Sequence, residues 1–190
     1  MDSALRTDRL LLRRWRTEDR EPFAAMNGDP RVMEHMQGTM SPERSDAFID
    51  RIESHWEQHG WGLWAVAIPD AAAFVGYVGL WPADYVADGV VEVGWRLAHH
   101  AWGHGYATEA ARHAVRLGFE RVGLPEIVSF TVPQNGRSRR VMERIGLVRD
   151  PARDFDHPNV DPIAYPHLVR HVFYRLGRAE WSNGREGASG

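Results

Sequence analysis

Three histidines and two glycines are concentrated in the stretch HHAWGHGYATEA, residues 99–110, between a strand-like and a helix-like segment. Such a stretch suits either a metal held by imidazoles or an anion held by backbone N–H groups. Gly103 and Gly105 let an anion approach the main chain, and the first N–H groups of the following helix lack internal partners. His100 and His104 are four residues apart, but the glycine-rich segment between them argues against a helix presenting both to one metal, and the sequence has no His-Glu-x-x-His motif. The pattern therefore favours an anion site and predicts no metal.

Two common phosphate-binding motifs do not fit this stretch. The glycines are not followed by Lys-Ser or Lys-Thr, so the loop is not a P-loop. The spacing Gly103-x-Gly105-x-x-Thr108 lacks the third glycine of the dinucleotide fingerprint, and the preceding strands do not form a βαβ unit. A different kind of anion cradle is needed.

Two residues elsewhere in the sequence have side chains that can move protons. Glu92 lies on the polar face of a strand expected over residues 91–97, together with Arg96. Ser138 lies in the first turn of a helix that Asn135 is expected to cap. Each also has a purely structural explanation, because Glu92 can be solvated or paired with Arg96, and because Ser and Asn are favoured at helix N-termini. These alternatives stay open at this point.

Hydrophobic periodicity predicts the elements that must position these residues. We expect seven strands, over residues 10–15, 63–68, 74–81, 91–97, 127–132, from 147 onward, and 169–176. We expect four main helices, over residues 17–27, 42–59, 110–122 and 135–145. Strands that follow one another without intervening helices indicate an α+β fold around a mainly antiparallel sheet.

Bulk composition narrows the class of protein. The 190 residues suffice for one domain, which we place at residues 1–178, and residues 179–190 are expected to be disordered. The net charge of −3 argues against nucleic acid as a partner. The absence of cysteine excludes disulfides, thiolate nucleophiles and cysteine-bound zinc. No apolar leader and no run near the roughly 18 apolar residues of a membrane span is present, so we expect a cytoplasmic protein without a membrane partner.

A larger pattern joins these features. Its segments are EVGWRL at 92–97, WGHGYATEA at 102–110 and NGRSRRVMERIG at 135–146. The pattern resembles the GNAT superfamily of acyl-CoA-dependent N-acetyltransferases, and within it the subgroup of ribosomal-protein N-terminal (alanine/serine) acetyltransferases. The family's loop signature is Gln/Arg-x-x-Gly-x-Gly/Ala, and here His100 departs at the first position whereas Gly103 and Gly105 match. The resemblance extends from about residue 6 to residue 176.

The resemblance implies a fold and a co-substrate. The sheet of about seven strands, flanked by about four helices, is expected to splay between its fourth strand, 91–97, and its fifth, 127–132, and to admit the pantetheine arm of acetyl-CoA there. Backbone N–H groups from about residue 102 to 107 are expected to hold the pyrophosphate. A backbone N–H near Trp95 or Arg96, where the strand is expected to bulge, would meet the thioester oxygen. The implied cofactor-binding residues are Trp95, Arg96, Leu97, Trp102, Gly103, His104, Gly105, Tyr106, Ala107, Thr108, Asn135 and Arg140. Arg137 and Arg139 also lie near the expected phosphates, and the sequence does not decide which arginine binds them.

The resemblance also implies a reaction, the direct attack of a primary amine on acetyl-CoA in a ternary complex. Glu92 would be the base and Ser138 the acid. In the segment Phe-Asp-His-Pro, Asp156 or His157 could bind or deprotonate the amine, although Asp156 could equally serve a turn before Pro158. Ribosomal-protein acetylators have been proposed to use a glutamate in this later region, and none stands between residues 144 and 172.

The acceptor is the least determined part of the prediction. The acidic loop over residues 150–161 suits a cationic amine, and small amines, antibiotics and protein N-termini all remain candidates. A homodimer is compatible with the subgroup. The alternative function is a CoA-binding sensor or regulatory module without catalysis.

Overall fold

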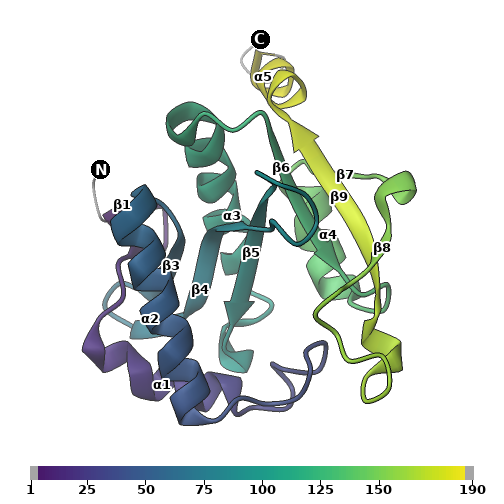
Figure 1. Ribbon diagram of the computed structural model, residues 1–190. Helices are drawn as coiled ribbons and strands as arrows, with labels where there is room; N and C mark the ends of the chain where they lie inside the picture. Colours follow the sequence, from purple (N-terminus) through teal and green to yellow (C-terminus); the bar gives the residue numbers. More distant parts are fainter. Residues whose placement is uncertain (1–3, 187–190) are drawn as a thin grey trace.

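The chain forms one twisted sheet, with α1 and α2 on one face and α3 and α4 on the other (Figure 1). The computed structural model describes residues 4–186. The strands are β1 (Ala4–Arg6), β2 (Leu11–Arg13), β3 (Leu63–Ile68), β4 (Ala72–Pro82), β5 (Val91–Leu97), β6 (Glu126–Thr131), β7 (Val148–Arg149), β8 (Phe155–Asp156) and β9 (Arg170–Gly177). They are arranged in the order β1-β2-β3-β4-β5-β6-β9-β7, and β8 pairs with β9. The helices are α1 (Arg20–Asn27), α2 (Pro42–His59), α3 (Tyr106–Leu117), α4 (Gly136–Arg144) and α5 (Arg178–Glu186).

The α+β fold predicted from the sequence is confirmed. The seven expected strands correspond to β2 to β7 and β9, and the four expected helices to α1 to α4. The two additional strands, β1 and β8, have three and two residues. Strands this short contain too few alternating positions to produce a periodic signal. All strand pairs are antiparallel except β5 with β6.

Local chemistry sets the ends of the longest helix, α2. Ser41 accepts a hydrogen bond from the backbone N–H of Arg44 at 3.4 Å, and Pro42 occupies the first helical position. Gly60 ends the helix with a φ of 71°, which a residue without a Cβ adopts at little cost. The boundaries predicted from Ser41-Pro42 and Gly60 are therefore confirmed.

The sheet opens between β5 and β6. β5 pairs with β4 along its whole length, whereas its parallel pairing with β6 is limited to Glu92 opposite Val128. Beyond that point the two strands diverge toward their carboxyl ends (Figure 1). The predicted splay between the strand at 91–97 and the strand at 127–132 is confirmed. The bulge expected near Trp95 is not confirmed, because the register between β4 and β5 continues without a shift.

The open edge of β5 presents a defined set of backbone groups. The N–H of Ala98 donates to Val75 O on β4 at 2.9 Å. Backbone groups of successive residues along a strand alternate between its two edges. The N–H groups of Trp95 and Leu97 therefore face the opening toward β6, whereas the N–H of Arg96 faces β4. Divergence of the strands, rather than a bulge, frees these donors.

The C-terminal segment differs from the expected disorder after residue 178, because Arg178–Glu186 form helix α5. The carboxylate of Glu180 accepts hydrogen bonds from the backbone N–H of Gly177 and from Arg175, both at 2.8 Å. The ring of Trp181 packs on Phe119 with centroids 5.1 Å apart. These contacts with the body of the protein are what hold the helix. The rest of the expected tail, residues 187–190, lies outside the described residues. No helix within residues 4–186 combines the length and apolarity needed to cross a membrane.

Candidate active site

A cavity of about 550 Å³ lies where β5 and β6 separate. Its walls come from β5, β6, the loop before α3, the first turns of α3 and α4, the loop after α1, and two histidines near β9. The residues proposed from the sequence for the site line this cavity, except His104, Arg139 and Asp156. Those that do are Glu92, Trp95, Arg96, Leu97, Trp102, Gly103, Gly105, Tyr106, Ala107, Thr108, Asn135, Arg137, Ser138, Arg140 and His157.

The loop before α3 is shaped by two glycines in the left-handed region. Gly103 has a φ of 81° and Gly105 a φ of 80°. Gly105 is the N-cap of α3 and brings no side chain to the helix end, so the first N–H groups of the helix remain for a ligand. A Cβ built on Gly103 would meet no atom within 4 Å. The exposed N–H groups and the open space beside Gly103 fit a pyrophosphate bound at the main chain.

The glycine loop is anchored from the N-terminal segment of the chain. The carboxylate of Glu109 accepts hydrogen bonds from Thr7 Oγ1 at 2.5 Å, and from the backbone N–H and Nε of Arg9 at 2.9 and 2.7 Å. Arg9 Nη1 also donates to the carbonyl of His104 at 2.9 Å. Burial opposes the charge on Glu109, but the hydrogen bonds from Thr7 and Arg9 outweigh it and lower the pKa of Glu109. The ring of His104 stacks on Tyr106, so His104 supports the loop from outside the cavity.

These three anchoring residues had no assigned role in the sequence prediction. Thr7 and Arg9 lie about 100 positions from Glu109 along the chain. The signal in the sequence was the carboxylate of Glu109 in the first turn of a helix. A favourable interaction with the helix dipole is enough to explain a carboxylate there, so it did not indicate an anchor for the loop.

Glu92 lines the cavity without a charged partner among residues 4–186. Its half-buried carboxyl makes no hydrogen bond or ion pair with the residues that the structure describes. Burial raises the pKa of Glu92 to about 8. Arg96, the partner considered from the sequence, instead donates from Nη1 to Asn27 Oδ1 at 2.7 Å and lies over the ring of Tyr77. The pairing of Glu92 with Arg96 is therefore wrong, and the carboxyl is available to a ligand.

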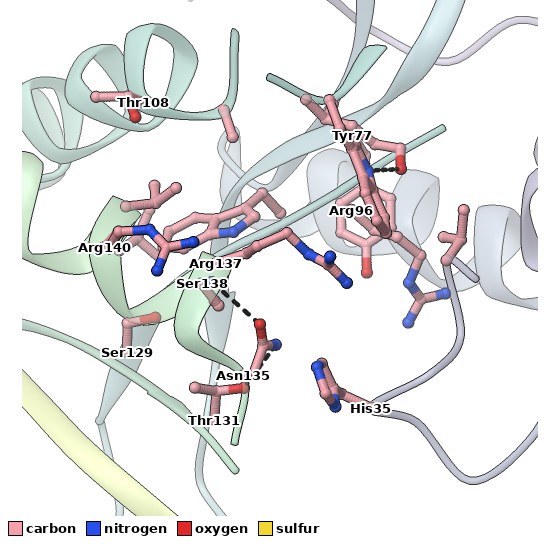
Figure 2. A pocket seen from close by; sticks show the side chains of 18 of the residues that line it. His35, Tyr77, Arg96, Thr108, Ser129, Thr131, Asn135, Arg137, Ser138 and Arg140 are labelled. Atoms are coloured by element: carbon pink, nitrogen blue, oxygen red, sulfur yellow. Dashed lines mark hydrogen bonds between the residues drawn. The ribbon is translucent and has the colours of Figure 1, made fainter. Parts of the chain in front are cut away.

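Ser138 and Asn135 meet at the start of α4 (Figure 2). Asn135 Oδ1 accepts from the backbone N–H of Ser138 at 3.1 Å, and Asn135 Nδ2 donates to Thr131 Oγ1 at 3.1 Å. The predicted capping role of Asn135 is confirmed. The cap uses the backbone N–H of Ser138 and not its hydroxyl. The hydroxyl of Ser138 is therefore available to a ligand in the cavity, which Ser138 lines.

Replacement of Asn135 by Ala is expected to lower the stability of the protein by about 1 kcal/mol, because α4 loses its N-cap. For a chain of this size the melting temperature should fall by about 2–4 °C. Asn135→Asp retains an oxygen that can accept from Ser138 and is the matched control. A melting curve of Asn135→Ala that coincides with wild type would contradict the importance of this cap.

The three arginines near the start of α4 have different partners. Arg137 forms an ion pair with Glu34 at 2.8 Å and lies over the ring of Trp102 at 4.4 Å. Arg139 does not line the cavity; it donates to Tyr174 OH and to Pro133 O. Arg140 lines the cavity and has no carboxylate partner among residues 4–186. Arg140 is therefore the best placed of the three to meet a phosphate.

The acidic loop expected to attract a cationic amine turns its carboxylates away from the cavity. Asp150 pairs with Arg175, Asp154 with Arg149, and Asp156 with Arg170 at 3.2 Å. The fourth carboxylate of the loop, Asp161, accepts from the backbone N–H groups of Ile163 and Ala164, and none of the four lines the cavity. Asp156 does not line the cavity, and the prediction of a cationic acceptor that rested on this loop loses its support.

His157 does reach the cavity, with a defined tautomer. The backbone N–H of Asn159 donates to its Nδ1 at 3.2 Å, so the proton of the neutral ring is on Nε2. Burial lowers the pKa of His157 to about 4. An Nε2–H group can donate a hydrogen bond but cannot take a proton from an amine. Within the described part of the chain, no three His, Asp or Glu side chains form a set suited to a metal ion.

Similarities to known proteins identify the family of the chain. Residues 9–148 match the family described as Acetyltransferase (GNAT) domain. The FsC-acetyl coenzyme A-N(2)-transacetylase of Aspergillus fumigatus is 33% identical over 193 residues, covering 93% of this chain and 77% of that protein. The crystal structure of a GNAT-family acetyltransferase from Bacillus anthracis has a TM-score of 0.77 at 25% identity, covering 93% of this chain and 99% of that one.

The subgroup suggested by the sequence is also represented among the similar folds. The ribosomal-protein-S5-alanine acetyltransferase from Vibrio fischeri has a TM-score of 0.71 at 14% identity, covering 95% of this chain and 99% of that one, which shows a shared fold. The family match covers most of the chain, and members of this family use acetyl-CoA. The chain therefore belongs to the GNAT family and is an acetyltransferase.

Proposed function

We propose that the protein transfers the acetyl group of acetyl-CoA to a primary amine, with Glu92 as the base. The observation that carries the proposal is the unpaired carboxyl of Glu92 inside the cavity, with its pKa raised to about 8 by burial. A base is most effective when its pKa lies near the working pH. The name of the Aspergillus fumigatus relative, a transacetylase that acts at N(2) with acetyl coenzyme A, supports the same class of reaction.

Each part of the cavity has a role in this proposal. The N–H groups after Gly105 and the guanidinium of Arg140 hold the phosphates of acetyl-CoA. The open edge of β5 receives the pantetheine arm, and the N–H of Trp95 or Leu97 hydrogen-bonds the thioester oxygen. Acetyl-CoA supplies an activated acyl group and a thiolate leaving group.

Proton transfer then falls to two side chains. Glu92 takes a proton from the ammonium or the attacking amine, because an α-amine has a pKa of about 7.7–8.0 and a lysine about 10.4, and only the neutral amine is nucleophilic. As the N–C bond forms and the C–S bond breaks, Ser138 would donate its hydroxyl proton to the departing thiolate. Ser138 would then regain a proton from solvent, to which Glu92 releases the proton taken from the amine. His157, protonated on Nε2, acts as a hydrogen-bond donor to the acceptor rather than as the base. The base is thus Glu92 and not a residue of the segment 154–157.

Binding of acetyl-CoA should raise the melting temperature. At a concentration about 100 times Kd, the stabilisation is about 2.7 kcal/mol. At about 2–4 °C per kcal/mol, the rise is several degrees. EDTA serves as the control and should leave the curve unchanged. No shift with acetyl-CoA, or a collapse with EDTA, would contradict the proposed binding mode.

Release of free thiol from acetyl-CoA, measured with a panel of amines and N-terminal peptides, tests the transfer itself. Turnover with any member of the panel supports the proposed reaction. Binding of acetyl-CoA without turnover across the panel would favour the CoA-binding sensor instead.

A further inference from the structure

Four uncharged ring side chains form the wall of the cavity beyond Glu92. We call this group the acceptor-side cluster; its members are Tyr85, Phe130, His157 and His171. Ring centroids are 4.8 Å apart for Tyr85 and His157, 4.8 Å for His157 and His171, and 6.0 Å for Tyr85 and Phe130. The ring of Phe155 packs behind Phe130 at 5.2 Å. The cluster is thus a continuous aromatic surface that faces the cavity.

The cluster carries no charge at neutral pH. Burial lowers the pKa of His157 to about 4, and it also lowers the pKa of His171. Burial and the neighbouring carboxyl of Glu92 raise the pKa of the Tyr85 phenol. An ammonium group placed here would meet rings but no anion apart from Glu92.

The other charges around the cavity are positive. Glu92 is the one carboxylate among the described residues that line it. The lining guanidinium groups are those of Arg31, Arg96, Arg137, Arg140 and Arg144. Arg31 and Arg137 are paired with Asp29 and Glu34. An acceptor with several ammonium groups would meet the single carboxylate of Glu92 and would be repelled by Arg96, whose guanidinium has no carboxylate partner among the described residues.

Two loops meet beside the cluster. Gln37, in the loop after α1, donates from Nε2 to Asn159 O at 2.8 Å and accepts at Oε1 from the backbone N–H of Asp161 at 3.0 Å. Figure 1 shows these loops side by side at the carboxyl ends of β5 and β6. The same loops supply Met36 and His157 to the cavity lining. This contact ties the two loops together beside the cluster, which favours a small molecule over an extended peptide as the acceptor.

We propose that the acceptor is a small primary monoamine with an aromatic or otherwise uncharged apolar body, which packs on the acceptor-side cluster while its amine reaches Glu92. The inference rests on the proposed acetyl transfer and specifies its substrate class. Offset and edge-on ring contacts favour an aromatic body. Polyamines and aminoglycosides, which carry several ammonium groups, are the classes that this arrangement disfavours most, since one carboxylate lines the cavity among the described residues.

The test compares phenethylamine, spermidine, kanamycin and a peptide with N-terminal alanine as acceptors of the wild-type enzyme. We expect kcat/KM for phenethylamine to exceed each of the others at least about tenfold. Tyr85→Ala should raise KM for phenethylamine, and Tyr85→Glu should shift the preference toward spermidine, since it places a carboxylate in the cluster. Trp61→Ala, an aromatic truncation outside the cavity lining, is the control and should leave the preference unchanged.

Calorimetry separates this inference from the proposed function. Phenethylamine should bind to the enzyme saturated with CoA, and spermidine should bind at least about tenfold more weakly, whether or not turnover follows. Preferred acetylation of spermidine, kanamycin or the peptide would overturn the acceptor class and leave the acetyl transfer intact. Absence of turnover with every amine, despite binding of phenethylamine, would overturn the acetyl transfer and uphold the binding preference.

Discussion

Glu92→Gln is expected to lower kcat by about 10²- to 10⁴-fold, the usual contribution of a positioned general base. Glutamine has nearly the same shape but cannot take a proton from the acceptor amine. Because the carboxyl of Glu92 holds no other described side chain in place, the surrounding structure should persist. Steady-state kinetics with one acceptor and calorimetry with acetyl-CoA are the measurements, and the affinity for acetyl-CoA should stay nearly unchanged.

The pH dependence gives a second test of the same residue. Since burial raises the pKa of Glu92 to about 8, activity that requires the carboxylate should rise as the pH increases through about 8. The acceptor amine titrates as well, so the informative quantity is the difference between wild type and Glu92→Gln with the same acceptor. Turnover equal to wild type in the variant would remove Glu92 from the mechanism.

The raised pKa also has a consequence for stability. A carboxyl whose pKa is higher in the folded state than in the unfolded state stabilises the fold at low pH, and this contribution is lost as the pH rises through the folded-state pKa, here about 8. Wild type should therefore lose stability relative to Glu92→Gln between about pH 5 and pH 9. Denaturation curves of both proteins at the two pH values measure the difference.

The parts of the fold that were predictable are those in which local pattern and tertiary structure agree. The alternation of apolar and polar residues over 91–97 is enough to predict β5, and the capping residues around α2 are enough to predict that helix. Neither prediction needs contacts with residues distant in the sequence. β1 and β8 were not predicted because two or three residues are too few to show the alternation of apolar and polar side chains that marks a strand. α5 was missed because its stability comes from Phe119 and the end of β9, whereas its own composition resembles a disordered tail.

Most of the candidate residues that line the cavity were predicted from the sequence, but their charge states and ion pairs were not. The spacing of Gly103, Gly105 and Asn135 indicates the cradle and the cap, since both depend on local backbone geometry. The state of Glu92 depends on Arg96 binding Asn27, which lies 69 positions away, and on burial by β6. The prediction that the acidic loop attracts a cationic amine failed for the same reason. The arginines that pair with its carboxylates come largely from other segments of the chain.

Gly103→Ala is expected to raise the Kd for CoA by about tenfold or more. A tenfold change corresponds to about 1.4 kcal/mol of binding free energy. The added methyl group would lie in the open space beside the cradle, where the phosphates approach the main chain. Gly89→Ala is a matched control. Gly89 has a φ of 74°, an added Cβ there would also have no atom within 4 Å, and the residue does not line the cavity.

The two variants should lose similar stability. An alanine in the left-handed conformation costs about 1–2 kcal/mol at either position, so both variants should have similarly lowered melting temperatures. Calorimetry with CoA then isolates the cradle, because only Gly103→Ala should lose affinity. Equal affinities in the two variants would show that the phosphates bind elsewhere than at the main chain of this loop.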